Sequence, residues 1–466
     1  MRRREFVGVL AAASAVRAAD EWVPLFDGKS LNGWKPNESP GSWKIENGTL
    51  IAAGPRSHLY YTAREFRNFE LKADVMTTRG ANSGIYFHTA MVEKGFPTQK
   101  GFEVQVNNTH IGEGTYRERK KTGSLYGVRN VYKAMARDNE WFEMHIAARG
   151  PQVQISVNGT LLVDWVEPSN WTGNHIDRGL FALQCHDPGS KVSYRNIRVK
   201  ALPDDIQVPV QPVADEIDRE LARLGGANYP VVDYHVHLKG GWTLEQALAE
   251  SRRTGIQYGI AVNCGLGFPI SSDGPARDFL ASMKGQPVFI ALQGEGREWP
   301  TLVSKDTIAQ FDYVFTDSMT WTDDAGKRMR LWIPAEVGQI NDVQKFMDTL
   351  VNRAVGILTR EPIDIYVNPT YLPGVIAAQY DSLWTPERMD RVVEAAAKSG
   401  VAMEINCGRN LPSAAFIKRA KAAGVKFTFG TNNTDAQVGR LEYGLKMVQE
   451  CDLKWQDFWT PKRERG

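Results

Sequence analysis

Two histidines in the middle of the chain have the type and spacing of metal ligands. In the run VVDYHVHLKGG, residues 231–241, His235 and His237 follow an apolar segment. If that segment is a β-strand, side chains two residues apart lie on the same side of it, so both imidazoles can reach one cation. The chemistry predicted is the binding of one divalent, zinc-like ion. A metal-free relic of such a site and a buried polar pair are the alternatives.

A second pattern, in the first half of the chain, places polar side chains at alternate positions of three segments. These are Glu103, Gln105 and Asn107 in GFEVQVNN; Asn82, Tyr86 and His88 in NSGIYFH; and Gln184 and His186 in GLFALQCHD. A sheet face with carboxylate, amide, imidazole and phenol groups suits a polyhydroxylated ligand, which needs donors, acceptors and an aromatic surface. The alternative is the ordinary solvated face of an antiparallel sheet.

The elements that would carry this second pattern are short β-strands. Residues 20–202 consist of alternating segments separated by Gly, Asn and Asp, with almost no helical periodicity. Asn-Gly pairs at 47–48 and 158–159 are strong hairpin signals. We therefore expect an all-β antiparallel sandwich over residues 20–202.

The pattern changes after a Pro-rich and Asp-rich stretch, and residues 203–228 are predicted to be a linker with a short helix. Over residues 229–460, strand-like runs alternate with amphipathic helical runs. This alternation predicts an α/β barrel of the TIM type with a parallel sheet, in which chemistry lies at the carboxyl ends of the strands. The polar residues predicted at those ends are His235, His237, Glu295, Asp317, Asn368, Glu404 and Asn433.

Composition limits the classes of partner. The formal net charge of the 466-residue chain is +2, which gives no reason to expect nucleic acid or an anionic membrane. Residues 1–19, MRRREFVGVLAAASAVRAA, have a basic head, a short apolar run and small residues at the end, as in a twin-arginine-like export signal. The apolar run is too short to span a bilayer, so we expect a periplasmic or secreted bacterial protein. The 4 cysteines form no disulfide framework and are expected to be buried thiols.

The second half carries motifs that resemble the polymerase-and-histidinol-phosphatase (PHP) superfamily. They are DYHVHL at 233–238, GEG at 294–296, DYVFTDS at 312–318, IYVNP at 365–369, AMEIN at 402–406 and GVKFTFGTNN at 424–433. This resemblance implies a distorted barrel that binds several metals, with phosphoester hydrolysis as the usual activity.

Several family ligands are missing from this chain. Asn368-Pro369 stands where that family has His-Pro, and residues 431–434, TNNT, replace Ser-Asp-Ala-His. No histidine follows His237. A site built on several imidazoles therefore cannot be assembled, and we expect at most one divalent ion. Its candidate ligands are His235, His237, Glu295, Asp317 and Glu404.

The first half resembles the 3-keto-disaccharide hydrolase family, a concanavalin-like sandwich of exported bacterial proteins. The motifs are LFDGKSLNGW at 25–34, WKIENGTL at 43–50, ANSGIYFH at 81–88, GFEVQV at 101–106, TGSLYG at 122–127, EWFEMHIAARG at 140–150, ISVNG at 155–159, GLFALQCH at 179–186 and YRNIRVK at 194–200. The resemblance implies cleavage of glycosides oxidised at C3 of the sugar. The ketone acidifies the C2 proton, a general base removes it, and the C1 group leaves.

Residue roles are predicted from two observations together: which polar residues share a sheet face, and which of them lie in these motifs. Glu103 is the predicted base, with His186 or His88 as the acid. The predicted sugar-binding residues are Asn82, Tyr86, Gln105, Tyr126 and Gln184. Because only one carboxylate is evident on this face, elimination is favoured over displacement between two acids.

Three hypotheses follow from the two halves. The leading one is an exported hydrolase or lyase that cleaves 3-keto-glycosides, joined to an accessory barrel with an eroded metal site. In the second, the sandwich is a sugar-binding module without turnover. In the third, the barrel is the enzyme, a metal-dependent hydrolase, and the sandwich targets it to carbohydrate.

Overall fold

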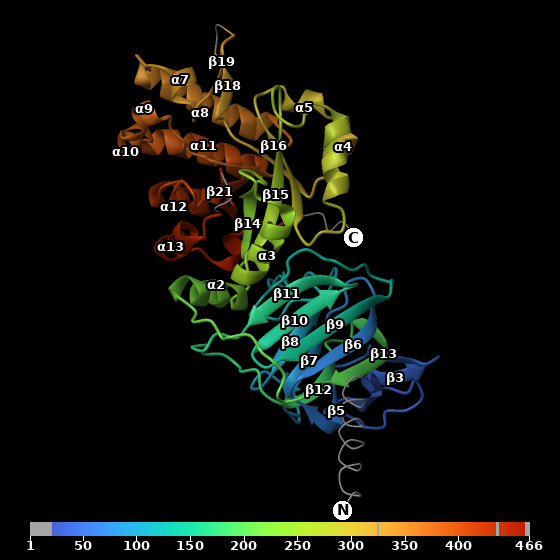
Figure 1. Ribbon diagram of the computed structural model, residues 1–466. Helices are drawn as coiled ribbons and strands as arrows, with labels where there is room; N and C mark the ends of the chain where they lie inside the picture. The colour runs from blue at the N-terminus through green and yellow to red at the C-terminus, as the bar shows by residue number, and fades with distance from the viewer. Residues whose placement is uncertain (1–20, 324–325, 435–437, 462–466) are drawn as a thin grey trace, which may run out of the picture. The chain divides into compact units, whose positions relative to one another are not determined.

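The structure is a computed structural model that describes residues 21–323, 326–434 and 438–461 (Figure 1). The predicted export signal at residues 1–19 lies outside the described residues. The chain divides into two compact units, one of which ends at Asn228, apart from the short segment Arg252–Gly255, while the other begins at Tyr229.

The first unit contains the predicted antiparallel sandwich. Its larger sheet has eight strands in the order β11-β10-β9-β6-β13-β4-β3, with β1 paired to β13. The strands are β1 (Val23–Pro24), β3 (Trp43–Glu46), β4 (Thr49–Ala53), β6 (Phe69–Thr77), β9 (Phe142–Arg149), β10 (Gln152–Val157), β11 (Thr160–Val166) and β13 (Lys191–Ala201). Both predicted Asn-Gly hairpins are present, because Asn47 and Asn158 adopt φ of 50° and 49° between paired strands.

The smaller sheet carries the polar pattern found in the sequence. Its five strands run in the order β2-β5-β12-β7-β8. They are β2 (Trp34–Pro36), β5 (Ser57–Phe66), β12 (Gly179–Cys185), β7 (Ser83–Thr89) and β8 (Phe102–Val106). Phe181 and Leu183 enter the core between the two sheets, whereas Ala182 packs with Tyr60 and Tyr86 on the other side. The sheet therefore has an inner apolar face and an outer face with polar groups.

The second unit is built on a closed barrel of parallel strands, as predicted (Figure 1). The order is β14 (Val232–Val236), β15 (Gln257–Cys264), β16 (Phe289–Gly294), β17 (Tyr313–Thr316), β20 (Ile365–Tyr366), β21 (Ala402–Asn406) and β22 (Phe427–Gly430). Pairing of Asp233 on β14 with Phe429 on β22 closes the ring. Parallel pairing throughout brings the carboxyl ends of all these strands to one end of the barrel.

Helices follow most barrel strands. They are α3 (Leu244–Thr254), α4 (Asp273–Ser282), α5 (Trp299–Leu302), α6 (Lys305–Ile308), α7 (Pro334–Val337), α8 (Val343–Arg360), α9 (Gly374–Ala377), α10 (Tyr380–Leu383), α11 (Pro386–Ser399), α12 (Ala414–Ala422) and α13 (Glu442–Glu450). Side chains of Asp342, Thr385 and Ser413 cap α8, α11 and α12. The hairpin β18 (Thr320–Thr322) and β19 (Arg328–Arg330) follows β17.

The remaining elements are short. Helix α2 (Glu216–Gly226) lies within the predicted linker and begins with a capping box between Asp215 and Asp218. The 3-10 helices are η1 (Pro40–Ser42) and η2 (Trp455–Asp457). Among the described residues, no helix has the length and apolar character needed to cross a membrane. All 4 cysteines are described and unpaired.

Candidate functional site

A row of side chains crosses the outer face of the smaller sheet. In the strand register, Tyr60 on β5 lies opposite Ala182 on β12, which lies opposite Tyr86 on β7, which lies opposite Glu103 on β8. The segment after β8 adds a further member, because the Tyr126 amide donates to the Glu103 carbonyl at 2.9 Å. Opposed residues on one face of a sheet lie in contact. The register therefore gathers Tyr86, Glu103 and Tyr126, all predicted site residues.

Glu103 lies between Tyr86 and Tyr126 in this row and is partly exposed. The Gln184 Nε2 atom is 3.4 Å from Glu103 Oε1 and donates to the Tyr86 hydroxyl at 2.9 Å. Burial raises the pKa of the Glu103 carboxyl to about 7, against hydrogen bonds from Tyr86 and Gln184 that lower it. A carboxylate with a pKa near neutrality is well matched to the work of a general base.

A glycine makes room for this carboxylate. A Cβ added at Gly84 on β7 would overlap Glu103 Oε1 and would lie 2.8 Å from Glu103 Cδ. The Glu103 side chain therefore crosses over the backbone of β7 toward Gln184 on β12. Because Gly84 has no Cβ, the Glu103 carboxylate can occupy this space.

His58 completes the site and was not among the predicted residues. It lies opposite Gln184 in the pairing of β5 with β12, and its Nε2 is 3.4 Å from Gln184 Nε2. Burial lowers the pKa of His58 to about 4, so the ring is neutral at pH 7. His58 Nδ1 and Gln184 Oε1 are both buried without a hydrogen-bond partner in the described structure. Buried polar atoms without a protein partner commonly bind water or a ligand.

His186 follows the end of β12 and is partly exposed. Its Nδ1 donates to Asp187 Oδ2 at 2.7 Å, which fixes the ring. The ring lies 5.7 Å from the ring of Phe96, which in turn lies 5.4 Å from the ring of His58. Phe96 is 38% exposed, so an accessible aromatic surface lies between the two imidazoles.

His88 does not share this face, and that part of the prediction is wrong. Its backbone adopts φ of 53°, which breaks the alternation after Tyr86 and turns the side chain toward the core. The ring packs edge-on against Phe69 at 5.5 Å, and Nε2 donates to the Arg67 carbonyl at 2.8 Å. His88 is fully buried among aromatic residues, and its role as an acid stays a prediction.

Asn82 and Gln105 occupy the neighbouring part of the face. The Gln105 Nε2 atom donates to Asn82 Oδ1 at 3.1 Å, and both residues are buried. These amides satisfy one another and hold β7 to β8. Their contact with a sugar therefore stays a prediction.

The barrel brings His235 and His237 together, as the spacing predicted. Their ring centroids are 5.2 Å apart. The His235 Nδ1 atom donates to Glu404 Oε1 at 2.6 Å, and the His237 Nδ1 atom donates to the Ala261 carbonyl at 3.1 Å. Neither buried Nε2 atom has a hydrogen bond of good geometry in the described structure, although Gln293 lies close enough to His237 to oppose the lowering of its pKa by burial. An imidazole held through one nitrogen and unoccupied at the other has the arrangement of a metal ligand.

The carboxylates predicted to share this ion are engaged elsewhere. Glu404 Oε2 accepts from the Asn368 amide at 2.8 Å. Asp317 Oδ2 accepts from Asn368 Nδ2 at 2.9 Å, and Glu295 Oε1 accepts from Asn263 Nδ2 at 2.7 Å. Within residues 21–323, 326–434 and 438–461, no three His, Cys, Asp or Glu side chains are grouped to hold a metal. Of the five predicted ligands, the structure therefore presents only the two imidazoles as available donors.

Burial also changes the ionisation of these carboxylates. It raises the pKa of Glu295, and the neighbouring Asp317 carboxylate raises it further. Burial likewise raises the pKa of Asp317. Asparagines at 368, 406 and 433 stand at the same strand ends and neutralise no charge. Burial and the proximity of the two carboxylates therefore favour the protonated forms of Glu295 and Asp317 more than water would.

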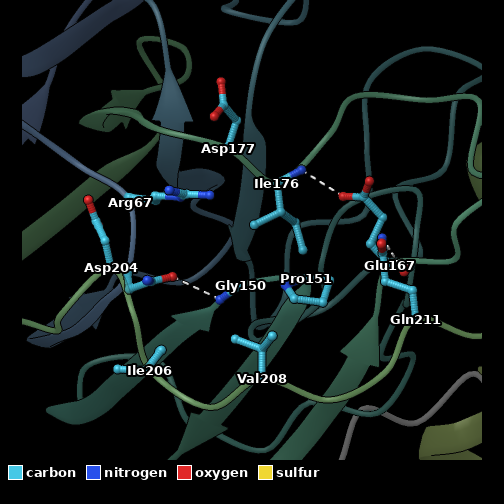
Figure 2. Close-up of a pocket in the computed structure, with 11 residues that line it drawn as sticks. Arg67, Gly150, Pro151, Glu167, Ile176, Asp177, Asp204, Ile206, Val208 and Gln211 are labelled. Carbon is cyan, nitrogen blue, oxygen red and sulfur yellow. Dashed lines mark hydrogen bonds between the residues drawn. The ribbon is translucent and has the colours of Figure 1, made fainter.

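A cavity of about 290 Å³ lies elsewhere in the first unit (Figure 2). Gly150 and Val208 line it, and the Glu167 carboxylate accepts from the Ile176 amide at 2.6 Å beside it. Of its four charged residues, Arg67, Asp177 and Asp204 are exposed and Glu167 is buried. No predicted site residue borders this cavity, so we do not assign it to the site.

Comparison with known proteins finds a family and relatives that are similar to the first unit. Residues 21–200 match the family described as 3-keto-alpha-glucoside-1,2-lyase-like domain. The chain is 25% identical over 236 residues to a 3-keto-disaccharide hydrolase of Bacteroides thetaiotaomicron, a match that covers 40% of this chain and 79% of that protein.

Two solved structures are also similar to the sandwich. A candidate glycosyl hydrolase from Parabacteroides distasonis is 24% identical with a TM-score of 0.36, over 40% of this chain and 95% of that one. A carbohydrate-binding module from Bacillus subtilis is 14% identical with a TM-score of 0.26, over 35% of this chain and 93% of that one. The family match is therefore confined to residues 21–200, a region that the chain joins to a parallel seven-stranded barrel.

Proposed function

We propose that the first unit cleaves glycosides whose sugar carries a ketone at C3, with Glu103 as the general base. The observation that carries the proposal is the position of Glu103. It is partly exposed, has a pKa raised by burial to about 7, and lies in a row of polar and aromatic side chains on the outer face. The family match over residues 21–200 supports the same substrate class.

The proposed reaction is an elimination followed by hydration. The Glu103 carboxylate takes the C2 proton, and the electron pair of that C–H bond forms an enolate with the C3 ketone. The enolate then expels the C1 oxygen, leaving an enone, and the departing oxygen takes a proton. Water adds to C1 of the enone, which restores a 3-keto sugar and balances the overall hydrolysis.

The surrounding residues supply the remaining parts of this reaction. His186, oriented by Asp187, is the proposed proton donor to the leaving oxygen. Tyr86 and Gln184 adjoin Glu103 and are placed to donate to the enolate oxygen. Since His88 is in the core, His186 is the proposed acid of the two predicted histidines.

The test is turnover by the full chain. We expect the wild-type protein to release the leaving sugar from a 3-keto-disaccharide, measured by mass spectrometry, and to be inert toward the unoxidised disaccharide. Glu103→Gln should lower the rate at least about 100-fold, because general base catalysis contributes that much or more. Saturable sugar binding without release would favour the binding-module hypothesis, and an unchanged rate in Glu103→Gln would refute Glu103 as the base.

We also propose that the barrel binds one divalent cation through His235 and His237, with water as further ligands. The two buried, unpartnered Nε2 atoms support this proposal. Zinc or cobalt titrated into the full chain by calorimetry should bind at one site, and His235→Ala should abolish it. His110→Ala, which changes a histidine of the first unit, serves as the matched control. Equal binding by wild type and His235→Ala would contradict the proposal.

Finally, we propose that the chain acts outside the bacterial cytoplasm. The support is the export-like composition of residues 1–19. Fractionation of expressing cells, followed by amino-terminal sequencing, should recover a periplasmic or secreted form that begins near residue 20. Recovery of the intact chain from the cytoplasm alone would contradict this.

A further inference from the structure

A buried ion pair lies beside the Glu103 row and has no role in the reaction so far described. The Lys120 side chain is 1% exposed and that of Glu118 is 4% exposed, with Lys120 Nζ 3.5 Å from Glu118 Oε1. Burying two such charges costs more than their attraction returns unless further hydrogen bonds hold them. The pair therefore depends on further hydrogen bonds to offset the cost of its burial.

Every polar atom of the Glu118 carboxylate is engaged. Its Oε2 accepts from the Tyr116 hydroxyl at 2.9 Å and from the Tyr126 hydroxyl at 3.1 Å. Its Oε1 accepts from the Lys120 amide at 2.9 Å. Glu118 is thus held as an acceptor for two tyrosines and is not placed to act as a second catalytic acid.

The Lys120 ammonium connects this carboxylate to the row. It lies 4.4 Å from the centre of the Tyr126 ring, and the Tyr126 amide donates to the Glu103 carbonyl. The bridge between Val104 and Leu125 sets Tyr126 beside Glu103 on the same face. One aromatic ring therefore separates the ion pair from the base.

The pair is locked by a residue that lies beyond the family match. Asn228 Oδ1 accepts from Lys120 Nζ at 3.3 Å, and Asn228 Nδ2 donates to the Arg117 carbonyl at 2.6 Å. The family match ends at residue 200, whereas the compact unit continues to Asn228. The Asn130 side chain also donates to the Gly225 carbonyl at 3.1 Å, at the end of α2. The site is thus built with help from the segment that follows the matched domain.

We propose that Glu118 and Lys120, held by Asn228, are positioning residues of the Glu103 site that hold Tyr126 against the base and set the charge it experiences. This inference rests on the proposed function of Glu103. Through Asn228, residues 201–228 help to hold the site. The catalytic domain therefore extends beyond residue 200, where the family match ends.

The two charges act on Glu103 in opposite directions. After burial and the Tyr86 hydrogen bond, the Glu118 carboxylate raises the pKa of Glu103 and the Lys120 ammonium lowers it. The titratable and polar groups that interact with Glu103 are Tyr86 from β7, Gln184 from β12, Tyr194 from β13, and Tyr126, Glu118 and Lys120 from the segment after β8. Relative to wild type, removing the Lys120 charge should therefore raise the pKa of Glu103, and removing the Glu118 charge should lower it.

The experiment measures Glu103 directly in the full-length protein. The side-chain carboxyl of Glu103 is followed by carbon-13 NMR, with the signal assigned by its loss in Glu103→Gln, while pH is varied. We expect Lys120→Met to raise the titration midpoint by about one pH unit and Glu118→Gln to lower it by a similar amount. Lys44→Met, an exposed lysine on β3, should leave the midpoint unchanged.

Kinetics then separate this inference from the proposed function. If the wild type turns over the 3-keto-disaccharide, the acid limb of its pH–rate profile should shift with the NMR midpoint in each variant, and Asn228→Ala should lower kcat about 10-fold. A second outcome is that the wild type shows no turnover while the two midpoints still move in opposite directions. That result would contradict the proposed reaction and support the positioning role of Glu118 and Lys120. Midpoints that stay fixed, or move together, overturn the inference. If Lys120→Met does not fold, the double variant with Glu118→Gln, which removes both charges, must return the midpoint to that of wild type.

Discussion

Glu103 is the only group of the row that combines solvent access with a pKa near neutral pH. Its carboxyl is buried enough for desolvation to raise the pKa to about 7, yet the side chain stays partly exposed. The ordinary value for this group is 4.5. Since the folded state favours the protonated form more than the unfolded state does, Glu103 links stability to pH.

This linkage gives a prediction with a defined sign. The stabilisation from protonated Glu103 is complete below about pH 4.5 and is lost as pH rises through about 7. Glu103→Gln removes the ionisable group, so its free energy of unfolding should exceed that of wild type by about 1–3 kcal/mol at pH 8. At pH 5 the two proteins should be closely similar. Urea denaturation at both pH values measures this, and a variant less stable at pH 8 would contradict it.

The two histidines predicted as acids should respond differently to replacement. His186→Ala removes a partly exposed ring outside the core, so activity should fall about 10- to 1,000-fold while the melting temperature changes little. His88→Ala leaves a cavity beside Phe69 and should cost about 2–3 kcal/mol of stability. Its remaining folded fraction should keep near-normal kcat. Calorimetry measures the stability of each variant and kinetics measures its activity. Lost activity in His88→Ala together with normal activity in His186→Ala would make His88 the acid.

At the scale of the strands, β7 supplies the space that Glu103 occupies. A side chain at residue 84 would displace the Glu103 carboxylate, which is the end of a flexible side chain and can move away without unfolding the sheet. We expect Gly84→Ala to lower kcat about 10- to 100-fold through misplacement of the base, with a small change in melting temperature. Gly41→Ala faces open space and is the control. Full activity in Gly84→Ala would show that the observed Glu103 conformation is not the working one.

Strand alternation was sufficient to predict much of the site. It placed Glu103, Tyr86 and Gln184 on one face, and pairing of β12, β7 and β8 brought them into contact. It failed at His88, where a left-handed residue ends the alternation and no glycine marks the change. Local pattern carries no information about a single φ of this kind.

Other residues of the site depend on contacts between distant segments. His58 belongs to the alternating run SHLYY, and only the pairing of β5 with β12 shows that it meets Gln184. Lys120 lies in RERKK, which in sequence is typical of a solvated charged loop. Its burial follows from contacts with Tyr126 and Asn228, which local periodicity does not encode. Long-range packing therefore set the limit of the sequence prediction.

At the scale of the whole molecule, the chain joins two units with different chemical resources. The first presents a base, imidazoles and aromatic rings on a sheet face, and the second presents two unpartnered imidazole nitrogens at the end of a barrel. The motifs predicted both folds because each has a strong period, two residues in the sandwich and strand–helix repetition in the barrel. The asparagines at the strand ends of the barrel, Asn368 and Asn433, were also evident from the sequence.

If the enzyme lies in the first unit, the barrel site should be dispensable for it. The double variant His235→Ala/His237→Ala should release sugar from a 3-keto-disaccharide within about twofold of the wild-type rate, because neither residue belongs to the unit that holds Glu103. Initial rates with and without a chelator provide the measurement. Loss of activity in the double variant, with Glu103→Gln still active, would transfer the reaction to the barrel.

The most direct test of the account is proton exchange at C2 of the substrate. The full-length protein is incubated in deuterium oxide with a 3-keto-disaccharide, and the released 3-keto sugar is analysed by NMR and mass spectrometry. Wild type should place deuterium at C2, because Glu103 removes that proton and solvent returns it, and Glu103→Gln should give neither deuterium nor product. Rapid release of product that retains its C2 proton would show that the bond breaks without C2 ionisation, and would contradict the central role of Glu103 as the base.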